Sequence, residues 1–282
     1  MNKRLLRSAV FGLALIVGAA SAPSLMAGEP AAAPRKGPSP ARLADGKPNW
    51  TGFWTPVGGL LDRNFGPREG SGPPPTPGVV TQAGPAQNSG GRTRGVSDLK
   101  SPYKEKYEEL LAASAKGIVL HDPAALCNPA GMPRMMNMTY GMELLQVPGM
   151  IAITSEYGPF TRRIFTDGRK HTPEDELDPT YAGESIGHWE GDTLVVDTIG
   201  IREDTLIDQS GLMHSDKLHL VERWTQTEPG VLSVEITVED PVVFTAPWKI
   251  NKRYGFRPEL SIREYNCLEN NRNVSETGAP TF

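Results

Sequence analysis

The sequence has little charge imbalance, few histidines and only two cysteines, and each shortage excludes a class of protein. With 29 basic and 33 acidic side chains, the formal net charge is −4, which gives no basic footprint for nucleic acid or anionic lipid. The five histidines and two cysteines include no H-E-x-x-H motif or close ligand repeat, which argues against a metal site. Beyond the first 27 residues, no run approaches the roughly 20 apolar residues of a membrane helix.

Residues 1–27 are typical of an export signal. Three basic residues precede an apolar run over 10–20, and Ser24-Leu25-Met26-Ala27 forms a cleavage end. The apolar run is short for a bilayer span, which needs roughly 20 residues; an uncleaved membrane anchor is the alternative. We therefore predict a periplasmic or secreted protein with no integral membrane segment after signal removal.

The two cysteines, Cys127 and Cys267, are separated by about half of the chain. In an oxidising compartment they most simply form one disulfide, which would tie the end of the fold to its beginning. Closing a loop of that length stabilises a fold by roughly 5 kcal/mol in the chain-entropy model. A nucleophilic thiol is the alternative, although neither cysteine has a partner at a redox spacing.

Composition divides the remaining chain into a flexible leader at 28–48, a single domain at 49–271 and a C-terminal tail at 272–282. Within the domain, residues 66–95 include eight glycines and six prolines. Such a stretch buries too little apolar surface to order itself, so we predict a flexible insert there. Residues 103–116 are helix formers with one apolar stripe, which predicts one helix.

From Met142 onward the sequence consists of short β-rich runs broken by turn residues. Together with an early run, they predict strands at 50–54, 143–147, 150–156, 161–166, 184–189, 193–199, 218–227, 231–238, 248–254 and 260–267. Turns such as Pro148-Gly149 and Pro229-Gly230 are short, and short connections join antiparallel neighbours.

Alternation of apolar and polar residues predicts that this sheet buries one face. Leu218, Leu220 and Trp224 point one way, and His219 and Arg223 point the other. A twisted sheet of this size tends to close, because closure removes its exposed edges. We therefore predict an all-β fold, an antiparallel meander closing into a calycin-like barrel of about 8–10 strands, with one N-terminal helix and long Gly/Pro-rich loops. A curved sheet sandwich is the alternative.

Two resemblances add to this prediction. Gly52-Phe53-Trp54 resembles the G-x-W opening of lipocalin-type barrels, in which a tryptophan closes the barrel base. A longer resemblance, to an uncharacterised family of exported bacterial proteins, covers RRIFTDGR (162–169), GESIGHWEGDTLVVDT (183–198), HSDKLHLVERW (214–224), DPVVFTAPW (240–248) and EYNCLEN (264–270). This second resemblance implies export and a single domain, and it carries over no catalytic residue.

Three histidines are candidates for proton transfer. His171 follows a predicted turn, His188 lies on a predicted strand and His214 precedes another. On a barrel these three can converge at one end, where an imidazole would act as general acid or base. Nearby Arg163 would then steady developing negative charge.

Arginines and inward carboxylates form the second candidate group. A buried arginine at 162, 163 or 169 would hold a carboxylate or phenolate by a forked hydrogen-bond pair; alternatively these arginines face solvent or pair with Glu222 or Glu264. Alternation places Glu222 and Glu264 on the buried face. Because an unpaired carboxylate in an apolar core costs several kcal/mol, each must pair with an arginine or project into a polar cavity.

Other motifs have a simpler explanation. Residues 183–187 match G-x-S-x-G, but no helix follows, which excludes the elbow of a serine hydrolase. The carboxylates at 190 and 192 flank Gly191, as in a hairpin turn, although a pair of carboxylates can also serve as acid and base. The methionines between 132 and 138 favour packing over copper binding. The acidic run 174–178 lacks the spacing of a calcium loop.

We predict an exported barrel that binds a small apolar or aromatic molecule in its interior. Ligand contacts are expected from Trp224, Glu222, Met142, His214 and Glu264, with Leu220 and Ile153 lining the hollow. The alternative is a lyase or isomerase that needs no organic cofactor and uses His188 or His171 with Arg163 as its catalytic groups. A third possibility is an envelope interaction module. We expect no cofactor, no metal and no nucleic-acid partner.

Overall fold

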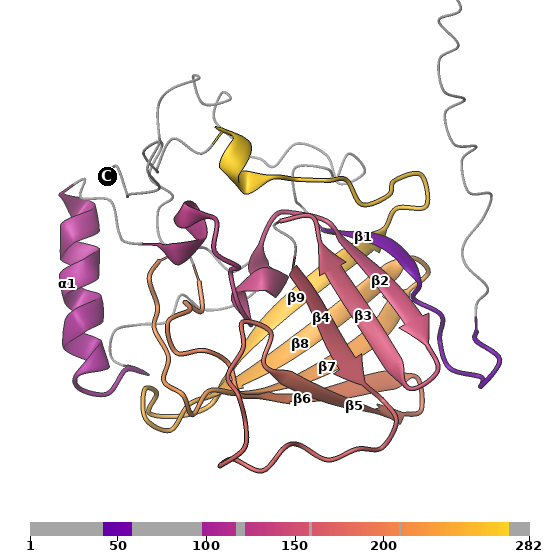
Figure 1. Ribbon diagram of the computed structural model, residues 1–282, viewed down its shortest axis with the longest axis horizontal. Helices are drawn as coiled ribbons and strands as arrows, with labels where there is room; N and C mark the ends of the chain where they lie inside the picture. The colour runs from indigo at the N-terminus through magenta and orange to yellow at the C-terminus, as the bar shows by residue number, and fades with distance from the viewer. Residues whose placement is uncertain (1–41, 58–97, 117–121, 158–159, 209, 271–282) are drawn as a thin grey trace, which may run out of the picture. The chain divides into compact units, whose positions relative to one another are not determined.

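The computed structural model describes residues 42–57, 98–116, 122–157, 160–208 and 210–270. The predicted signal peptide, the Gly/Pro-rich insert and the C-terminal tail lie outside these ranges. Within them, nine strands pair in sequence order around a closed barrel, accompanied by one α-helix (Figure 1). The predicted barrel is confirmed, and no helix in the described ranges is long and apolar enough to cross a membrane.

The strands are β1 (Gly52–Pro56), β2 (Met142–Val147), β3 (Met150–Ser155), β4 (Phe160–Phe165), β5 (Glu184–Glu190), β6 (Thr193–Ile199), β7 (His219–Glu228), β8 (Val231–Glu239) and β9 (Trp248–Phe256). The helix is α1 (Tyr103–Ala115), and short 3-10 helices occur at η3 (Pro123–Leu126), η4 (Arg134–Asn137) and η5 (Cys267–Asn270). The methionines of the 132–138 segment are buried, which confirms a packing role.

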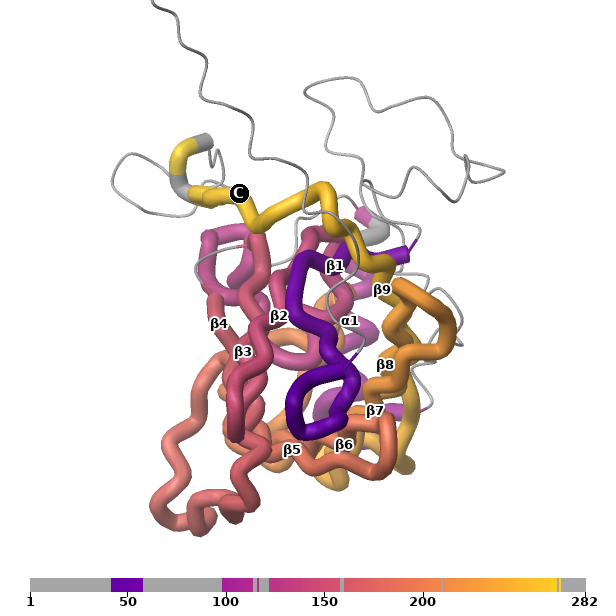
Figure 2. The backbone as a smooth tube through the Cα atoms, turned by 90° about the vertical axis from the view of Figure 1, so that its right-hand side faces the viewer, coloured from indigo at the N-terminus to yellow at the C-terminus, as the bar shows by residue number. Residues whose placement is uncertain are grey.

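Strand β1 closes the barrel, because it pairs with β2 on one side and with β9 on the other. Figure 2 shows it lying between these two strands. Eight of the nine pairings are antiparallel, whereas β4 and β5 run parallel and share only two residue pairs. The chain between them, residues 166–183, is long enough for a parallel crossover, which needs about a dozen residues.

The predicted strand at 260–267 is wrong. No strand follows β9 within the described part of the chain, because a closed barrel offers no free edge to which another strand can add. Residues 257–266, here called the C-terminal arm, instead run past β1 without entering the sheet (Figure 1). The arm ends at the predicted disulfide between Cys127 and Cys267, which is confirmed with a Cα–Cα distance of 5.5 Å.

A buried ion pair occupies the barrel interior. Both Arg162 and Glu222 have side chains that are 0% exposed, and Arg162 Nη1 donates to Glu222 Oε2 at 2.9 Å. Arg162 also donates to Ser185 Oγ at 3.0 Å and to Thr198 Oγ1 at 2.8 Å, while Trp224 Nε1 donates to Glu222 at 2.8 Å. Because these residues lie on β4, β5, β6 and β7, the network crosses the parallel junction that only two residue pairs hold together.

The residues expected to line a hollow surround this ion pair as part of the core. Trp224, Met142, Leu220 and Ile153 are at most 5% exposed and belong to one hydrophobic cluster. They therefore pack against one another and against the network.

Removal of one member of the buried pair should destabilise the barrel more than removal of both. Glu222→Leu leaves the Arg162 charge buried without a partner, which costs about 3–5 kcal/mol, whereas Arg162→Met with Glu222→Leu removes both charges and should recover much of that loss. Urea denaturation compares the free energies of unfolding, with exposed Arg163→Met as the control. A double variant as unstable as the single one would contradict this role for the pair.

Candidate functional site

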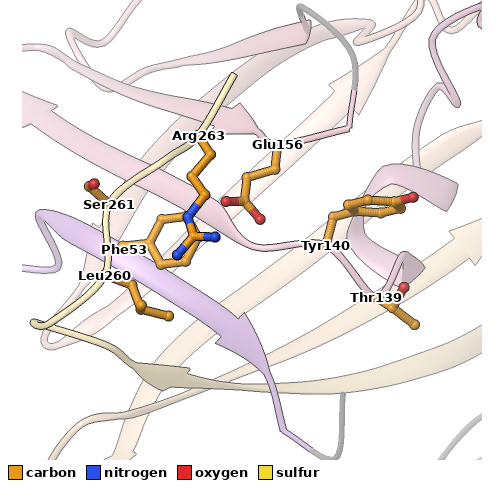
Figure 3. A pocket seen from close by; sticks show the side chains of 7 residues that line it. All are labelled: Phe53, Thr139, Tyr140, Glu156, Leu260, Ser261 and Arg263. Atoms are coloured by element: carbon orange, nitrogen blue, oxygen red, sulfur yellow. The ribbon is translucent and has the colours of Figure 1, made fainter. Parts of the chain in front are cut away.

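A pocket of about 310 Å³ lies between the C-terminal arm and the outer wall of the barrel. Its lining comes from β1, from the residues before β2 and after β3, and from the arm: Phe53, Thr139, Tyr140, Glu156, Leu260, Ser261 and Arg263. In Figure 3 the guanidinium of Arg263 and the carboxylate of Glu156 point into the same space, beside the ring of Phe53.

Phe53 belongs to this pocket because its side chain points away from the barrel interior. Its partner across the ladder is Glu143, which alternates along β2 with the buried Met142 and Leu144. Phe53 is nevertheless only 3% exposed. The arm lies against it, since the Arg257 amide donates to the Phe53 carbonyl at 2.9 Å. The arm thus converts an outward aromatic residue into a pocket wall.

Gly141 positions both the aromatic wall and the acidic group. A Cβ atom at this position would lie 2.1 Å from Cζ of Phe53, so only glycine leaves room for the ring. The Gly141 amide donates to Glu156 Oε2 at 3.3 Å, and the Glu156 amide donates to the Gly141 carbonyl at 3.0 Å. One carboxylate oxygen of Glu156 therefore has a backbone donor, and the other has capacity for a ligand.

Three tyrosines secure the far end of the arm, close to the disulfide in sequence. Tyr265 lies 5.5 Å from Tyr140 and 5.8 Å from Tyr157 between ring centroids, and the latter two are 5.0 Å apart. Burial and the hydrogen bond with Tyr265 raise the pKa of Tyr140 to about 12. The Tyr140 hydroxyl is therefore neutral at physiological pH and remains a hydrogen-bond donor.

Arg263 differs from most arginines of the described chain. Eight of these arginines pair with a carboxylate within 4.0 Å, whereas Arg263 makes no hydrogen bond or ion pair with another described residue. Its guanidinium is always charged and presents a planar fork that matches a carboxylate. The pocket thus combines apolar walls with an unpaired cation.

The structure does not bring the predicted catalytic residues together. His188 projects outward from β5 with a 66% exposed side chain, 3.4 Å from Glu190, and Arg163 is exposed on β4. His214 is only 2% exposed, with Nε2 2.8 Å from Thr205 Oγ1. The predicted convergence is therefore wrong, because strand parity places His188 and Arg163 on the outer face, whereas His214 is buried beside Thr205.

The predicted ligand-binding residues lie in different environments. Glu222 pairs with an arginine, which was one of the two predicted outcomes, and it forms the core together with Trp224 and Met142. Glu264 is exposed on the arm, so the prediction that it points inward is wrong, because its segment is not a strand. These residues do not line the pocket beneath the arm, and their contact with a ligand stays a prediction.

His171 belongs to a row of alternating carboxylates and imidazoles on the outside of the barrel. His171 lies between Glu184, 2.8 Å from Nδ1, and Asp197, 3.0 Å from Nε2. Asp197 also lies 2.9 Å from Nε2 of His219, whose Nδ1 is 3.2 Å from Glu239. We call these five residues the outer ionic row.

Protonation of His219 stabilises the row. The hydrogen bond to Asp197 is the main cause that raises the pKa of His219, assisted by Glu239 and opposed by burial. Burial alone would raise the pKa of Asp197, but hydrogen bonds from His219 and His171 lower it on balance. An imidazolium at position 219 can donate from both ring nitrogens, which a neutral imidazole cannot.

No cluster of His, Cys, Asp and Glu among the described side chains is arranged to hold a metal ion. Comparison of the chain with protein-family models and with curated proteins gave no match. The geometry of the pocket and the charge of its lining are therefore the basis for an assignment of function.

Sequence reasoning missed the pocket because its walls come from four separate segments. None of its residues was among the predicted site residues. The available signal was the predicted disulfide, which implies that the sequence before Cys267 lies near the sequence after Cys127. Arg263 and Tyr140 fall within those two stretches.

The outer ionic row predicts a pH-dependent stability. Because the folded pKa of His219 lies above its unfolded value of about 6.5, its stabilisation is complete below that pH and is lost as the pH rises through the folded pKa. His219→Gln should therefore lower the free energy of unfolding more at about pH 5.5 than at about pH 9. Urea denaturation at both pH values measures this, with exposed His188→Gln as the control. A deficit that grows toward alkaline pH would contradict the assignment.

Proposed function

We propose that this protein binds a small aromatic molecule with an anionic group in the pocket beneath its C-terminal arm. The observation that carries the proposal is the unpaired guanidinium of Arg263 at a pocket walled by Phe53 and Leu260. A volume of about 310 Å³ suits a small molecule. Ligand sites commonly combine apolar walls with a few polar groups that fix orientation.

Each wall of the pocket has a separate role in this proposal. The ring of Phe53 and the side chain of Leu260 contact the apolar body of the ligand. Arg263 pairs with its carboxylate in a forked geometry. Glu156 accepts a hydrogen bond from a ligand hydroxyl through the carboxylate oxygen that Gly141 does not occupy.

Binding is favoured over turnover by the arrangement of the titratable groups. A lyase or isomerase of the predicted kind needs a histidine and an arginine at one ligand, because proton transfer requires hydrogen-bond reach. His188, His171 and Arg163 share no site, and no histidine lines the pocket. The residues that line the pocket can hold a ligand, but they include no histidine that could transfer a proton to or from it.

We also propose that the protein is exported to the periplasm or secreted, and that it belongs with the exported bacterial family its motifs resemble. The signal-like first 27 residues support export. The disulfide between Cys127 and Cys267 supports an oxidising compartment.

Substitution of Arg263 should remove most of the affinity for an anionic ligand and little of the affinity for its neutral analogue. Titration calorimetry would compare salicylate with 2-hydroxybenzamide on the wild-type protein and on Arg263→Gln. We expect salicylate to bind the variant about tenfold more weakly, which corresponds to about 1.4 kcal/mol for a lost charge-assisted hydrogen bond.

Arg163→Gln is the matched control, because Arg163 is an exposed and unpaired arginine elsewhere on the barrel. Equal binding of salicylate by wild type and Arg263→Gln would refute the pocket. Loss of salicylate binding in Arg163→Gln alone would contradict the proposal, because it would place the ligand on the outer face of β4 instead of beneath the arm. Mass spectrometry of the recovered ligand would reveal turnover, if any occurs.

The disulfide should be required for the pocket, because it holds the arm that forms one wall. Cys127→Ser with Cys267→Ser should weaken salicylate binding and lower the free energy of unfolding by up to about 5 kcal/mol. Tryptophan fluorescence under the binding conditions would verify that the barrel remains folded. Undiminished affinity in the folded variant would show that the arm needs no covalent anchor.

A further inference from the structure

The pocket beneath the arm contains two opposite charges that do not pair with each other. Arg263 lies on the arm, Glu156 directly follows β3, and both line the pocket. Figure 3 shows the guanidinium and the carboxylate pointing into the same space. Neither forms an ion pair within 4.0 Å with another described residue, whereas Arg257, also on the arm, pairs with Glu259 at 2.6 Å. A gap that a ligand can occupy therefore separates the cation from the anion.

The backbone holds the carboxylate of Glu156 at the pocket. Its Oε2 accepts from the Gly141 amide at 3.3 Å, and the Glu156 amide donates to the Gly141 carbonyl at 3.0 Å. The other carboxylate oxygen, Oε1, accepts no hydrogen bond from another described residue. An ionised carboxylate accepts hydrogen bonds at both oxygens and donates none. Glu156 therefore offers the pocket a fixed, negatively charged acceptor.

A ligand whose only charge is negative satisfies just one of these two groups. Its carboxylate pairs with Arg263, but it then shares a small pocket with the carboxylate of Glu156, and like charges repel each other. A ligand ammonium removes this conflict, because it compensates the charge of Glu156. Its charge-assisted hydrogen bond is also roughly twice as strong as that of a neutral hydroxyl. The two charges of the pocket are therefore matched by a ligand that is both cationic and anionic.

We propose that the ligand of this pocket is an α-amino acid with an aromatic side chain. The inference rests on the proposed function and names the class of ligand. An α-amino acid carries its ammonium and its carboxylate on one carbon, so both charges fit within a pocket of about 310 Å³. The ammonium donates to Oε1 of Glu156, and the carboxylate accepts a forked pair from Arg263. The aromatic ring packs against Phe53 and Leu260.

Two ligands that differ only in the amino group test the proposal. Titration calorimetry near pH 7 would compare L-phenylalanine with 3-phenylpropionate, which has the same ring and carboxylate but carries hydrogen in place of the ammonium. We expect the wild-type protein to bind L-phenylalanine about tenfold more tightly than 3-phenylpropionate, because only the amino acid compensates the charge of Glu156. Equal affinities, or tighter binding of 3-phenylpropionate, would overturn the proposal without the need for any variant.

Glu156→Gln assigns the preference to this carboxylate. Glutamine keeps an acceptor for the Gly141 amide but removes the charge, so the variant should lose the preference for L-phenylalanine. It should bind 3-phenylpropionate at least as tightly as the wild type does, because the repulsion between two carboxylates is absent. Glu176→Gln is the matched control, because Glu176 is exposed and its side chain makes no hydrogen bond or ion pair with another described residue. This control should retain the preference.

The outcomes separate this inference from the proposed function. If salicylate and 3-phenylpropionate bind in a manner that depends on Arg263, but L-phenylalanine has no advantage, the anion-binding pocket stands and the amino-acid assignment is wrong. If none of the three compounds binds the wild-type protein, both proposals are refuted. An equal loss of affinity for both ring compounds in Glu156→Gln would show that Glu156 only supports the structure of the pocket, which would also overturn the assignment. Thermal unfolding of each variant verifies that the barrel is folded.

Discussion

The fold depends on the fully buried pair of Arg162 and Glu222. Strands β4 and β5 share only two residue pairs, so backbone hydrogen bonds alone hold that junction weakly. Arg162 reaches across it to Ser185 on β5, Thr198 on β6 and Glu222 on β7. If β4 or β7 shifted its register by one residue, its charged side chain would turn to the outer face. The opposite charge would then remain buried without its partner. The pair therefore specifies the alignment of four strands.

Closure of the barrel determines where a ligand can bind. The core packs around the ion pair, so the side chains expected to form a hollow surround charges instead. Because β1 pairs with both β2 and β9, no sheet edge remains for the strand-like residues of the arm. The arm consequently lies against the outer face of β1, and the disulfide fixes its end. The pocket therefore forms between the outer wall of the barrel and the arm, which cannot pair with the closed sheet.

Alternation and turn chemistry predicted the strands well, because one buried face imposes a period of two on each of them. The same parity was sufficient to separate Arg162 from Arg163, since Ile164 shares the inner face with Arg162. The predicted convergence of the histidines is wrong for the same reason, because the parity of β5 turns His188 to the outer face. No local sequence pattern predicts that Phe53 and Arg263 share a pocket. They come close only because the closed barrel leaves the arm outside the sheet. A tenth strand was predicted from β-propensity, which does not record whether a partner edge is free.

An unpaired cation beside apolar walls characterises the pocket beneath the arm, because Arg263 lies at the same pocket as Phe53 and Leu260. Most described arginines are paired, and an unpaired cation near apolar groups is unfavourable unless something else compensates it. A guanidinium keeps its proton under all ordinary conditions, so Arg263 can only recruit an anion. The permanent charge of this cation, together with the apolar walls beside it, therefore favours recognition of an anion over proton transfer.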